Sequence, residues 1–323
     1  MTTAAISEDL VTAKDRLTAI RREVDRVFIG DASIVDVLLV ALLAKGHVLL
    51  EGVPGVAKTT LVKAFSAALG CSIRRIQFTP DLLPADITGT YVYSPKDGTF
   101  SLRPGPIFAN VVLADEINRA PAKTQAALLE AMQEKQVTIE GDRFELPDPF
   151  LVLATQNPVD LEGTYPLPEA QIDRFLARAT MSYPQLRQEV AMLKMHGVDP
   201  PVAQSVVGPS EVSWLQGVAA RVFVEDDLYE YAVRLAAFTR THPKILLGAS
   251  PRASLVLLRA AKAKSVLAGR TYVTPDDLRA MVGPVLAHRL ILVPEIEGEP
   301  QARAQLVDEI VERVGYRKAV RPV

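Results

Sequence analysis

A glycine-containing loop between an apolar run and a helical pattern carries the clearest chemistry in this sequence. The loop reads Gly52-Val53-Pro54-Gly55-Val56-Ala57-Lys58-Thr59-Thr60. A predicted strand precedes it at residues 47–51, and a predicted helix follows from residue 61. Strand, loop and helix in this order are typical of a phosphate-binding P-loop, or Walker A motif, in which backbone N–H groups and the positive helix end face an anion. We expect Lys58 to contact the β- and γ-phosphates of a nucleotide and the Thr59 hydroxyl to bind Mg²⁺.

One residue departs from the P-loop pattern. Ala57 stands where a glycine is expected, directly before the lysine. Replacing glycine by alanine removes no polar atom from the loop, but the Cβ of alanine makes a strongly positive φ costly, so we expect Ala57 not to adopt one. The alternative interpretation of this stretch is a plain Gly/Pro turn that leaves Lys58 exposed.

A pair of carboxylates follows a second apolar run. Residues 111–114 are all apolar, as in a strand that is buried on both faces of a parallel sheet, and Asp115 and Glu116 come next. Ligands bind just outside the carboxyl ends of such strands. We therefore interpret this segment as a Walker B motif, with Asp115 orienting the Mg²⁺ shell and Glu116 polarising the water that attacks the γ-phosphate. Two solvated carboxylates at a strand end are the alternative, and the P-loop upstream argues against it.

An asparagine ends the next predicted strand, at residues 150–155. The amide of Asn157 has both a donor and an acceptor, so it could bond the γ-phosphate and the attacking water together. Alternatively, Asn157-Pro158 simply begins a turn.

The elements that must position these residues alternate along the first half of the chain. Helical patterns cover residues 10–27, 33–44 and 121–133, and strand patterns cover 47–51, 73–78, 110–115 and 150–155, which predicts an α/β fold with a parallel sheet. Residues 79–108 are rich in Pro and Gly and read as irregular, whereas residues 137–146 read as a β-hairpin. Beyond residue 184 the strand patterns stop and helical patterns begin near residues 186, 210, 226, 250, 275 and 301. We predict an α/β domain at residues 1–183 and a smaller all-helical domain at residues 184–323.

Composition narrows the class of protein. The 323 residues carry a net charge of −2 with both signs interspersed, which gives no footprint for nucleic acid or anionic lipid. No apolar run reaches the roughly 18–20 residues that span a bilayer, and no secretory signal is visible at the N-terminus. Cys71 is the single cysteine, which excludes an internal disulfide and a cysteine zinc site and favours a reducing, cytoplasmic location.

The motifs together resemble those of the AAA+ ATPases. They are the P-loop, Asp115-Glu116-Ile117-Asn118-Arg119 and Ala154-Thr155-Gln156-Asn157-Pro158. A further run is similar to that of the MoxR group, and MoxR proteins carry a P-loop similar to this one, alanine included. That run reads Glu162-Gly163-Thr164-Tyr165-Pro166-Leu167-Pro168-Glu169-Ala170-Gln171-Ile172-Asp173-Arg174-Phe175. The resemblance covers most of the chain and implies a P-loop sheet with flanking helices, followed by a small helical lid domain.

The resemblance also implies roles for two arginines. Arg174 matches the arginine finger that reaches the γ-phosphate bound by a neighbouring subunit, with Arg178 and Arg119 as second choices. A surface salt bridge of Arg174 with Asp173 or Glu169 is the alternative. Arg252 matches the sensor-2 position, where it would contact the γ-phosphate in its own subunit and couple the lid angle to the nucleotide state; otherwise it is an ordinary exposed arginine.

Three further segments have counterparts in the family. Residues 28–30 resemble the lining of an adenine pocket, and a role in the core is the alternative. Residues 80–108 resemble the helix-2 insert and residues 137–146 the pre-sensor-1 hairpin, both of which would face the central pore of a ring.

The function that the resemblance implies is Mg²⁺-dependent ATP hydrolysis at the subunit interfaces of a homo-oligomeric ring, expected to be a hexamer. The work would be chaperone-like maturation or remodelling of partner proteins, some with a von Willebrand factor A domain. Two alternatives remain: a nucleotide-dependent assembly module with incidental hydrolysis, and a DNA-acting or chelatase-like AAA+ relative.

Overall fold

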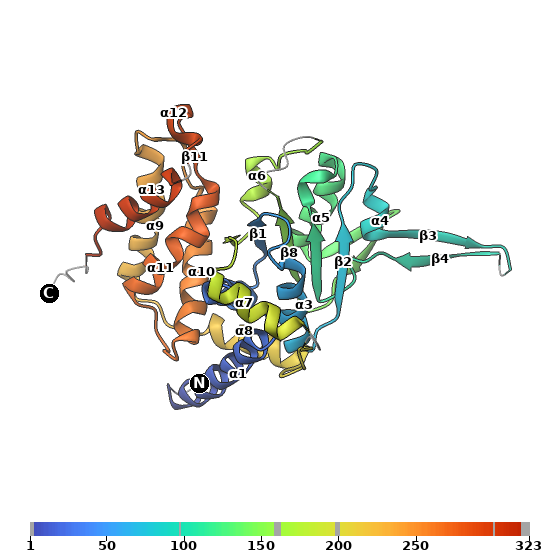
Figure 1. Ribbon diagram of the computed structural model, residues 1–323, viewed down its shortest axis with the longest axis horizontal. Coiled ribbons are helices and arrows are strands. Elements are labelled where there is room, and N and C mark those ends of the chain that lie inside the picture. Colours follow the sequence, from blue (N-terminus) through green and yellow to red (C-terminus); the bar gives the residue numbers. More distant parts are fainter. Residues whose placement is uncertain (1–2, 97, 158–162, 198–200, 300, 318–323) are drawn as a thin grey trace.

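The chain folds around a parallel five-stranded sheet with helices on both faces and a helical region at one side (Figure 1). The computed structural model describes residues 3–96, 98–157, 163–197, 201–299 and 301–317. Pro158 and Glu162, which belong to the motifs above, lie outside these ranges.

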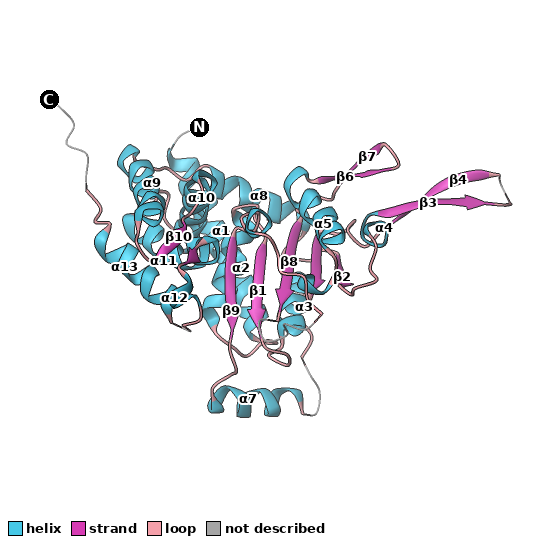
Figure 2. Cartoon of the chain, turned by 90° about the horizontal axis from the view of Figure 1, so that it is seen from above, coloured by secondary structure: helices cyan, strands magenta, loops and turns pink. Residues whose placement is uncertain are grey.

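The central sheet has the strand order β2-β5-β8-β1-β9, and every neighbouring pair is parallel. Its strands are β1 (Val48–Gly52), β2 (Ile73–Gln77), β5 (Val111–Asp115), β8 (Leu151–Gln156) and β9 (Ala177–Met181). Because all strands run the same way, their carboxyl ends share one edge of the sheet. Figure 2 shows these ends pointing towards α7 (Leu186–His196), which lies apart from the sheet.

Alternation of side chains along the strands gives the sheet two apolar faces. Val111 and Leu113 belong to the core that includes α2 and α3, whereas Val112 and Ala114 belong to the core on the other face, which includes α5. The flanking helices are α1 (Thr3–Asp25), α2 (Ala32–Leu43), α3 (Lys58–Ala68) and α5 (Ala122–Glu134). Burial on both faces explains why β1, β5 and β8 read as nearly continuous apolar runs rather than as alternating ones.

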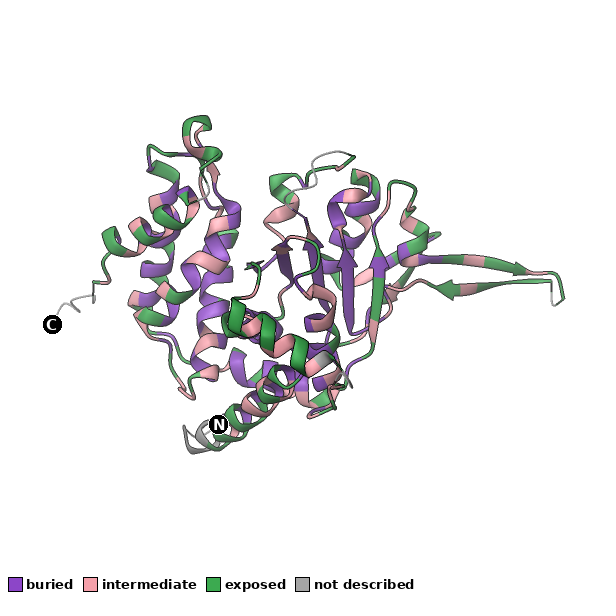
Figure 3. Cartoon of the chain, viewed as in Figure 1, coloured by how far each residue is buried: buried purple, intermediate pink, exposed green. Residues whose placement is uncertain are grey.

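Two hairpins extend from the α/β domain. The first follows the short helix α4 (Pro84–Thr88) and pairs β3 (Gly89–Ser94) with β4 (Thr99–Pro104). It projects beyond the body of the molecule and is largely exposed (Figure 3). The second pairs β6 (Gln136–Ile139) with β7 (Asp142–Glu145). The remaining short elements of this domain are η1 (Ile117–Arg119) and α6 (Glu169–Ile172).

The C-terminal region is mainly helical. Its elements after α7 are α8 (Pro209–Ala220), α9 (Asp226–Thr241), β10 (Ile245–Leu247), α10 (Pro251–Leu267), α11 (Pro275–Leu286), η2 (Ala287–Arg289), β11 (Ile291–Leu292), α12 (Pro294–Glu297) and α13 (Ala302–Arg313). Its buried residues join those of α1, α2 and α3 in one continuous core. Within the described ranges, no helix combines the length and the apolar character that crossing a bilayer requires.

The predicted fold class is confirmed, with three local differences. Residues 79–108 are not irregular but contain α4 and the β3–β4 hairpin, in which Tyr93 and Phe100 lie across from each other. Strand β9 escaped prediction because Arg178 interrupts a short run of small residues. The lid is not entirely helical, because β10 and β11 form a short antiparallel ladder. The domain boundary at residues 183/184 stays a prediction.

Candidate functional site

The P-loop connects the carboxyl end of β1 to the first turn of α3. Gly55 and Ala57 both have positive φ, of 85° and 61°. Ala57 therefore adopts the left-handed conformation that we expected alanine to exclude, and that expectation is wrong. The cost for a residue with a Cβ is roughly 1–2 kcal/mol. Gly52 is required for a different reason, since a Cβ there would lie 2.6 Å from the carbonyl oxygen of Met181 on β9.

Lys58 turns back towards its own loop. Its Nζ donates a hydrogen bond of 2.6 Å to the carbonyl oxygen of Gly52. Partial burial lowers the pKa of Lys58, while the charges of Asp115 and Glu116 oppose that shift. Lys58 thus bonds its own loop after β1 and feels the charges of both carboxylates at the end of β5.

A cavity of about 550 Å³ adjoins the P-loop. Residues 28–32 line one side, residues 55–57 line another, and residues 181–185 close it together with Gln188 and Met192. Gln188 Nε2 donates to the carbonyl oxygen of Gly30 at 3.2 Å, which ties α7 to this rim. Phe28 is both a core residue and part of the lining, and its contact with an adenine base stays a prediction. The volume is in the range of small-molecule sites.

Asp115 is held at the end of β5 by two neighbouring strands. Its Oδ1 accepts a hydrogen bond of 2.5 Å from the Thr155 hydroxyl on β8. Its Oδ2 accepts from Arg75 on β2, at 3.0 Å from Nε and 2.6 Å from Nη2. The Arg75 side chain is 53% exposed and the Asp115 side chain 12%, so the arginine can turn into solvent while the carboxylate stays in place.

Glu116 is fixed by the same hydroxyl through its backbone. It has a φ of 57°, and its N–H donates to Thr155 Oγ at 2.8 Å. Its carboxylate accepts from Gln77 Nε2 at 3.2 Å and from Arg119 Nε at 3.0 Å. Thr155 therefore sets the directions of both acidic residues.

Asn157 is buried and lies directly after β8. Because β8 pairs with both β5 and β1, its end lies between the carboxylates and the P-loop. The sheet thus brings Lys58, Asp115, Glu116 and Asn157 to one edge, as the sequence predicts.

The residues at this edge fit a nucleotide with Mg²⁺. The Thr59 hydroxyl and the Asp115 carboxylate are oxygen donors, which this hard cation prefers. No group of three or more His, Cys, Asp or Glu capable of holding a metal occurs among the described residues. Such a sparse donor set suits Mg²⁺, which keeps waters and phosphate oxygens as its other ligands.

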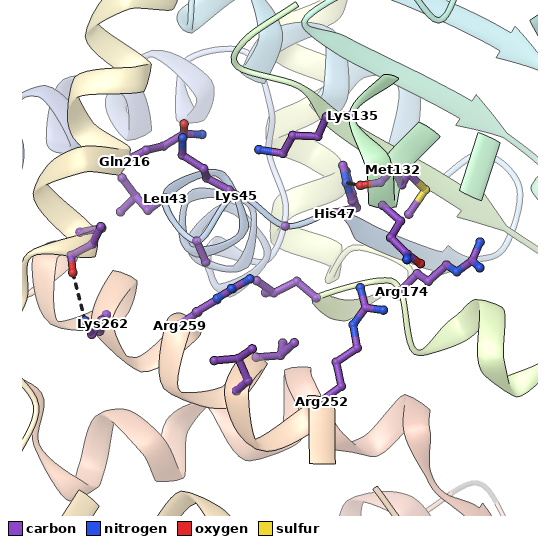
Figure 4. Close-up of a pocket in the computed structure, with 18 residues that line it drawn as sticks. Leu43, Lys45, His47, Met132, Lys135, Arg174, Gln216, Arg252, Arg259 and Lys262 are labelled. Carbon is purple, nitrogen blue, oxygen red and sulfur yellow. Dashed lines mark hydrogen bonds between the residues drawn. The ribbon is translucent and has the colours of Figure 1, made fainter. Parts of the chain in front are cut away.

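A second pocket lies at the opposite, amino end of the strands (Figure 4). Its volume is about 410 Å³, and its described lining residues include no acid. The cations that line it are Lys45, Lys135, Arg174, Arg252, Arg259 and Lys262, and we call it the cationic pocket. Burial lowers the pKa of Lys135, and the charges of Lys45 and Arg259 lower it further, while Asp148 opposes them.

Arg252 is therefore not placed as expected. It shares the cationic pocket with His47, which directly precedes β1, whereas the P-loop begins where β1 ends. Five residues at about 3.3 Å each separate the two ends. No P-loop residue lines the cationic pocket, so this structure does not place Arg252 beside the P-loop of its own chain, where the sensor-2 assignment expected it.

The three arginines considered for a role in trans differ in their partners. Arg119 pairs with Glu116 and Arg178 pairs with Glu51 at 3.2 Å, both within the chain. Within the described part of the chain, no carboxylate lies within salt-bridge distance of Arg174, and Asp173 pairs with Arg289 instead. The expected alternative, a salt bridge from Arg174 to Asp173 or Glu169, is absent there.

Several residues at these sites were missed at the sequence level. Arg75 and Gln77 alternate on β2, a pattern that could have placed both on the face that meets Asp115 and Glu116. Thr155 follows an apolar run in the same way as Asp115 and offered the same hint. The lysines of the cationic pocket had no recognisable spacing, since separate elements bring them together.

Comparison with known proteins agrees with this geometry. A family model described as "ATPase family associated with various cellular activities (AAA)" matches residues 47–177, and one described as "AAA lid domain" matches residues 237–313. The Bacillus subtilis protein YeaC is 47% identical over 92% of this chain and 95% of its own length. The Mycobacterium tuberculosis protein named "Chaperone MoxR1" is 45% identical over 90% of this chain and 80% of its own length.

A solved structure gives the same result for the fold. The crystal structure of a protein from Cytophaga hutchinsonii, described as an ATPase, superposes with a TM-score of 0.91 at 39% identity, over 98% of this chain and 99% of that one. Sequence motifs, sheet topology and relatives at this level of identity and coverage lead to one assignment: the chain belongs to the MoxR family of AAA+ ATPases.

Proposed function

We propose that this chain hydrolyses ATP with Mg²⁺ at sites shared between neighbouring copies in a ring, and that the cycle remodels partner proteins. The observation that carries this proposal is the separation of the two sites. The P-loop and both carboxylates lie at the carboxyl edge of the sheet, and Arg174 and Arg252 lie in a pocket at its amino edge.

Within one chain, the carboxyl edge supplies binding and the general base. Backbone N–H groups of residues 52–60 and Lys58 would hold the phosphates, and Thr59 and Asp115 would hold Mg²⁺, which when bound neutralises charge on the phosphate oxygens. Glu116 would accept a proton from the attacking water, and Asn157 would orient that water. The apolar side of the 550 Å³ cavity, including Phe28, would bind the adenine base of the nucleotide.

The cationic pocket supplies the complementary charge. Six cations without an acid among the described lining residues repel one another, and an anion from another molecule would relieve that repulsion. A triphosphate bound at the carboxyl edge of a second copy is such an anion. Arg174 and Arg252 would then stabilise the charge that develops on the γ-phosphate in trans.

The head-to-tail character of this contact supports a ring. An interface between two different surfaces of the same chain closes into a ring when the rotation permits. The relative named as a chaperone supports protein clients, and the family resemblance supports a hexamer, a cytoplasmic location and partners with a von Willebrand factor A domain.

The test is complementation between two inactive variants. Lys58→Ala removes the phosphate contact, and Arg174→Ala removes the cation offered to the neighbour, so each should lose ATP turnover alone. A mixture should recover activity, because about one interface in four then combines an intact P-loop with an intact Arg174. An Arg174→Ala protein with wild-type turnover would contradict the proposal.

A further inference from the structure

The carboxylate of Asp173 links the two segments that carry Arg174 and Arg252. Asp173 immediately precedes Arg174, and Ser250 lies two residues before Arg252. Ser250 Oγ donates to Asp173 Oδ2 at 3.1 Å, and Arg289 Nε donates to Asp173 Oδ1 at 2.7 Å. Both oxygens of Asp173 are therefore bonded to the lid.

The buried guanidinium of Arg289 also holds the backbone around Arg174. Its side chain is 2% exposed, and it donates to the carbonyl oxygens of Asp173 at 3.1 Å, Phe175 at 2.6 Å and Leu176 at 3.3 Å. A planar fork with several fixed donors is suited to such a convergence of acceptors. The segment that carries Arg174 is thus fixed on both sides by one lid residue.

Ser250 fixes the other arginine. It is the N-cap of α10, and Arg252 lies in the first turn of that helix. Its bond to Asp173 therefore ties the start of α10 to the segment before Arg174. The two arginines come from the lid and from the α/β domain, yet one carboxylate sets the spacing between their backbones.

We propose that Asp173, Ser250 and Arg289 form a positioning junction, which holds Arg174 and Arg252 so that both reach the same phosphate of a neighbouring copy. The inference rests on the proposed function, because it needs both arginines to act in trans. In this proposal the three junction residues would not contact the phosphate; they would act through the two arginines. A displacement of about 1 Å in a group that stabilises a transition state can cost about 100-fold in rate, so such a junction matters for turnover.

The first test is Asp173→Asn, which keeps the size of the side chain and removes its charge. We expect kcat to fall by about 10- to 100-fold, with the affinity for ATP within about twofold of wild type, because the P-loop lies at the other edge of the sheet. Ser250→Ala removes one bond and leaves the Asp173–Arg289 pair, so its loss in kcat should be smaller. An Asp173→Asn protein with wild-type kcat would overturn the proposal.

Complementation separates positioning from a general folding defect. Asp173→Asn has an intact P-loop, and Lys58→Ala has an intact junction, so a mixture of the two should recover turnover at about one interface in four. If the Arg174→Ala mixture recovers activity and the Asp173→Asn mixture does not, the junction proposal fails while the proposed function stands. If Arg174→Ala alone is fully active, the proposed function itself fails.

A second lid pair provides the matched control. Arg270 donates to Asp277 at 2.7 and 2.6 Å, and the pair, like Asp173–Arg289, joins one buried partner to one half-buried partner. Neither Arg270 nor Asp277 adjoins Arg174 or Arg252 in the sequence or lines the cationic pocket. Asp277→Asn should lower the melting temperature and leave kcat within about twofold of wild type. An equal loss of kcat in Asp277→Asn and Asp173→Asn would show that any broken lid pair has this effect, and would overturn the proposal.

Discussion

At the scale of single residues, one hydroxyl orients the acidic residues at the carboxyl edge of the sheet. Thr155 donates to Asp115 and accepts from the N–H of Glu116, so one oxygen is bonded to both acidic residues. The side chain is fully buried, which leaves no water to replace either bond. Leaving a buried donor or acceptor without a partner destabilises the folded protein by about 1–3 kcal/mol. The side chain of Asp115 and the backbone of Glu116 should therefore move when Thr155 is replaced.

Thr155→Val tests this role, because valine has nearly the shape of threonine without the hydroxyl. We expect kcat to fall by about 10-fold, since Glu116 loses the bond that fixes its direction, while the affinity for ATP changes less. Steady-state turnover and equilibrium nucleotide binding would measure the two effects. Thr124→Val is the control, since Thr124 is also buried and bonds the carbonyl oxygen of Leu82 away from this edge. Equal kcat values for both variants and wild type would contradict the assignment.

The residues that sequence could predict were those with local patterns. The P-loop and the pair Asp115-Glu116 follow recognisable strands, and the structure brings them to one edge of the sheet. Arg75, Gln77 and Thr155 act through contacts between neighbouring strands, and the sequence does not state which strands are neighbours. Sequence spacing therefore predicts the groups expected to contact phosphate but not the groups that orient them.

At the scale of elements, the elbow between β1 and α3 carries a left-handed alanine. The Ala57 conformation is favourable for glycine and costly for a residue with a Cβ. Ala57 also packs against the large apolar core, which compensates in part. The same turn directs the N–H groups of the loop, so its geometry also sets the phosphate contacts that we propose.

Ala57→Gly should raise the free energy of unfolding by about 1 kcal/mol, because relief of the left-handed strain exceeds the entropy that glycine adds to the unfolded chain. Chemical denaturation without nucleotide would measure it. The same replacement at Ala64, in the body of α3 and buried, should instead destabilise the protein, because the helix gains nothing from glycine. A loss of stability in Ala57→Gly would mean that the packing of the methyl group outweighs the strain.

His47 joins three elements at the opposite end of β1. Its Nδ1 accepts from the Val152 N–H at 2.9 Å, so Nε2 carries the proton and bonds the Met132 carbonyl oxygen at 3.1 Å. Burial lowers the pKa of His47 to about 4; the Met132 bond opposes that shift, and nearby Lys135 and Arg252 add to it. Burial also lowers the pKa of His288 well below its usual value, with Arg289 and Arg178 contributing.

These shifts predict instability in mild acid. An unfolded histidine binds a proton below about pH 6.5, whereas folded His47 does so only near pH 4, so the unfolded state holds more protons between these values. The free energy of unfolding should therefore fall as the pH is lowered through this window, by about 1 kcal/mol from His47 alone between about pH 6 and about pH 5. Denaturation at several pH values would measure the slope. His47→Asn, which keeps an acceptor and cannot titrate, should give a shallower slope, and parallel slopes would contradict the attribution.

Strands buried on both faces of the sheet were predictable, because short continuous apolar runs are typical of such strands. The β3–β4 hairpin was not: Phe100 and Leu102 alternate with polar residues on β4, but the alternation is short and lies in a stretch rich in Pro and Gly. The β10–β11 ladder is too short for any periodicity to show. Helices of the lid were predictable from N-caps and first-turn prolines, as at Ser250-Pro251.

At the scale of the whole molecule, parallel strands give the chain two unlike ends. One end carries Asp115 and Glu116 with the P-loop, and the other carries the cationic pocket. A chain with a net charge of −2 thus separates charge along the direction of its own sheet. Surfaces of opposite character at opposite ends favour head-to-tail association over a symmetric dimer.

This polarity predicts that assembly in the presence of ATP depends on salt. Screening at about 300 mM salt should weaken the attraction between the cationic pocket and the neighbour's nucleotide relative to about 50 mM, so the protein concentration that gives half-maximal turnover should rise by about threefold or more. Turnover at saturating protein should change little, because the chemistry at a formed interface is shielded from solvent ions. A variant with both Lys45→Gln and Lys135→Gln keeps Arg174 and Arg252 and lowers the charge of the pocket, so its salt dependence should be shallower. If the variant and the wild type show the same salt dependence, the charge of the cationic pocket does not drive assembly.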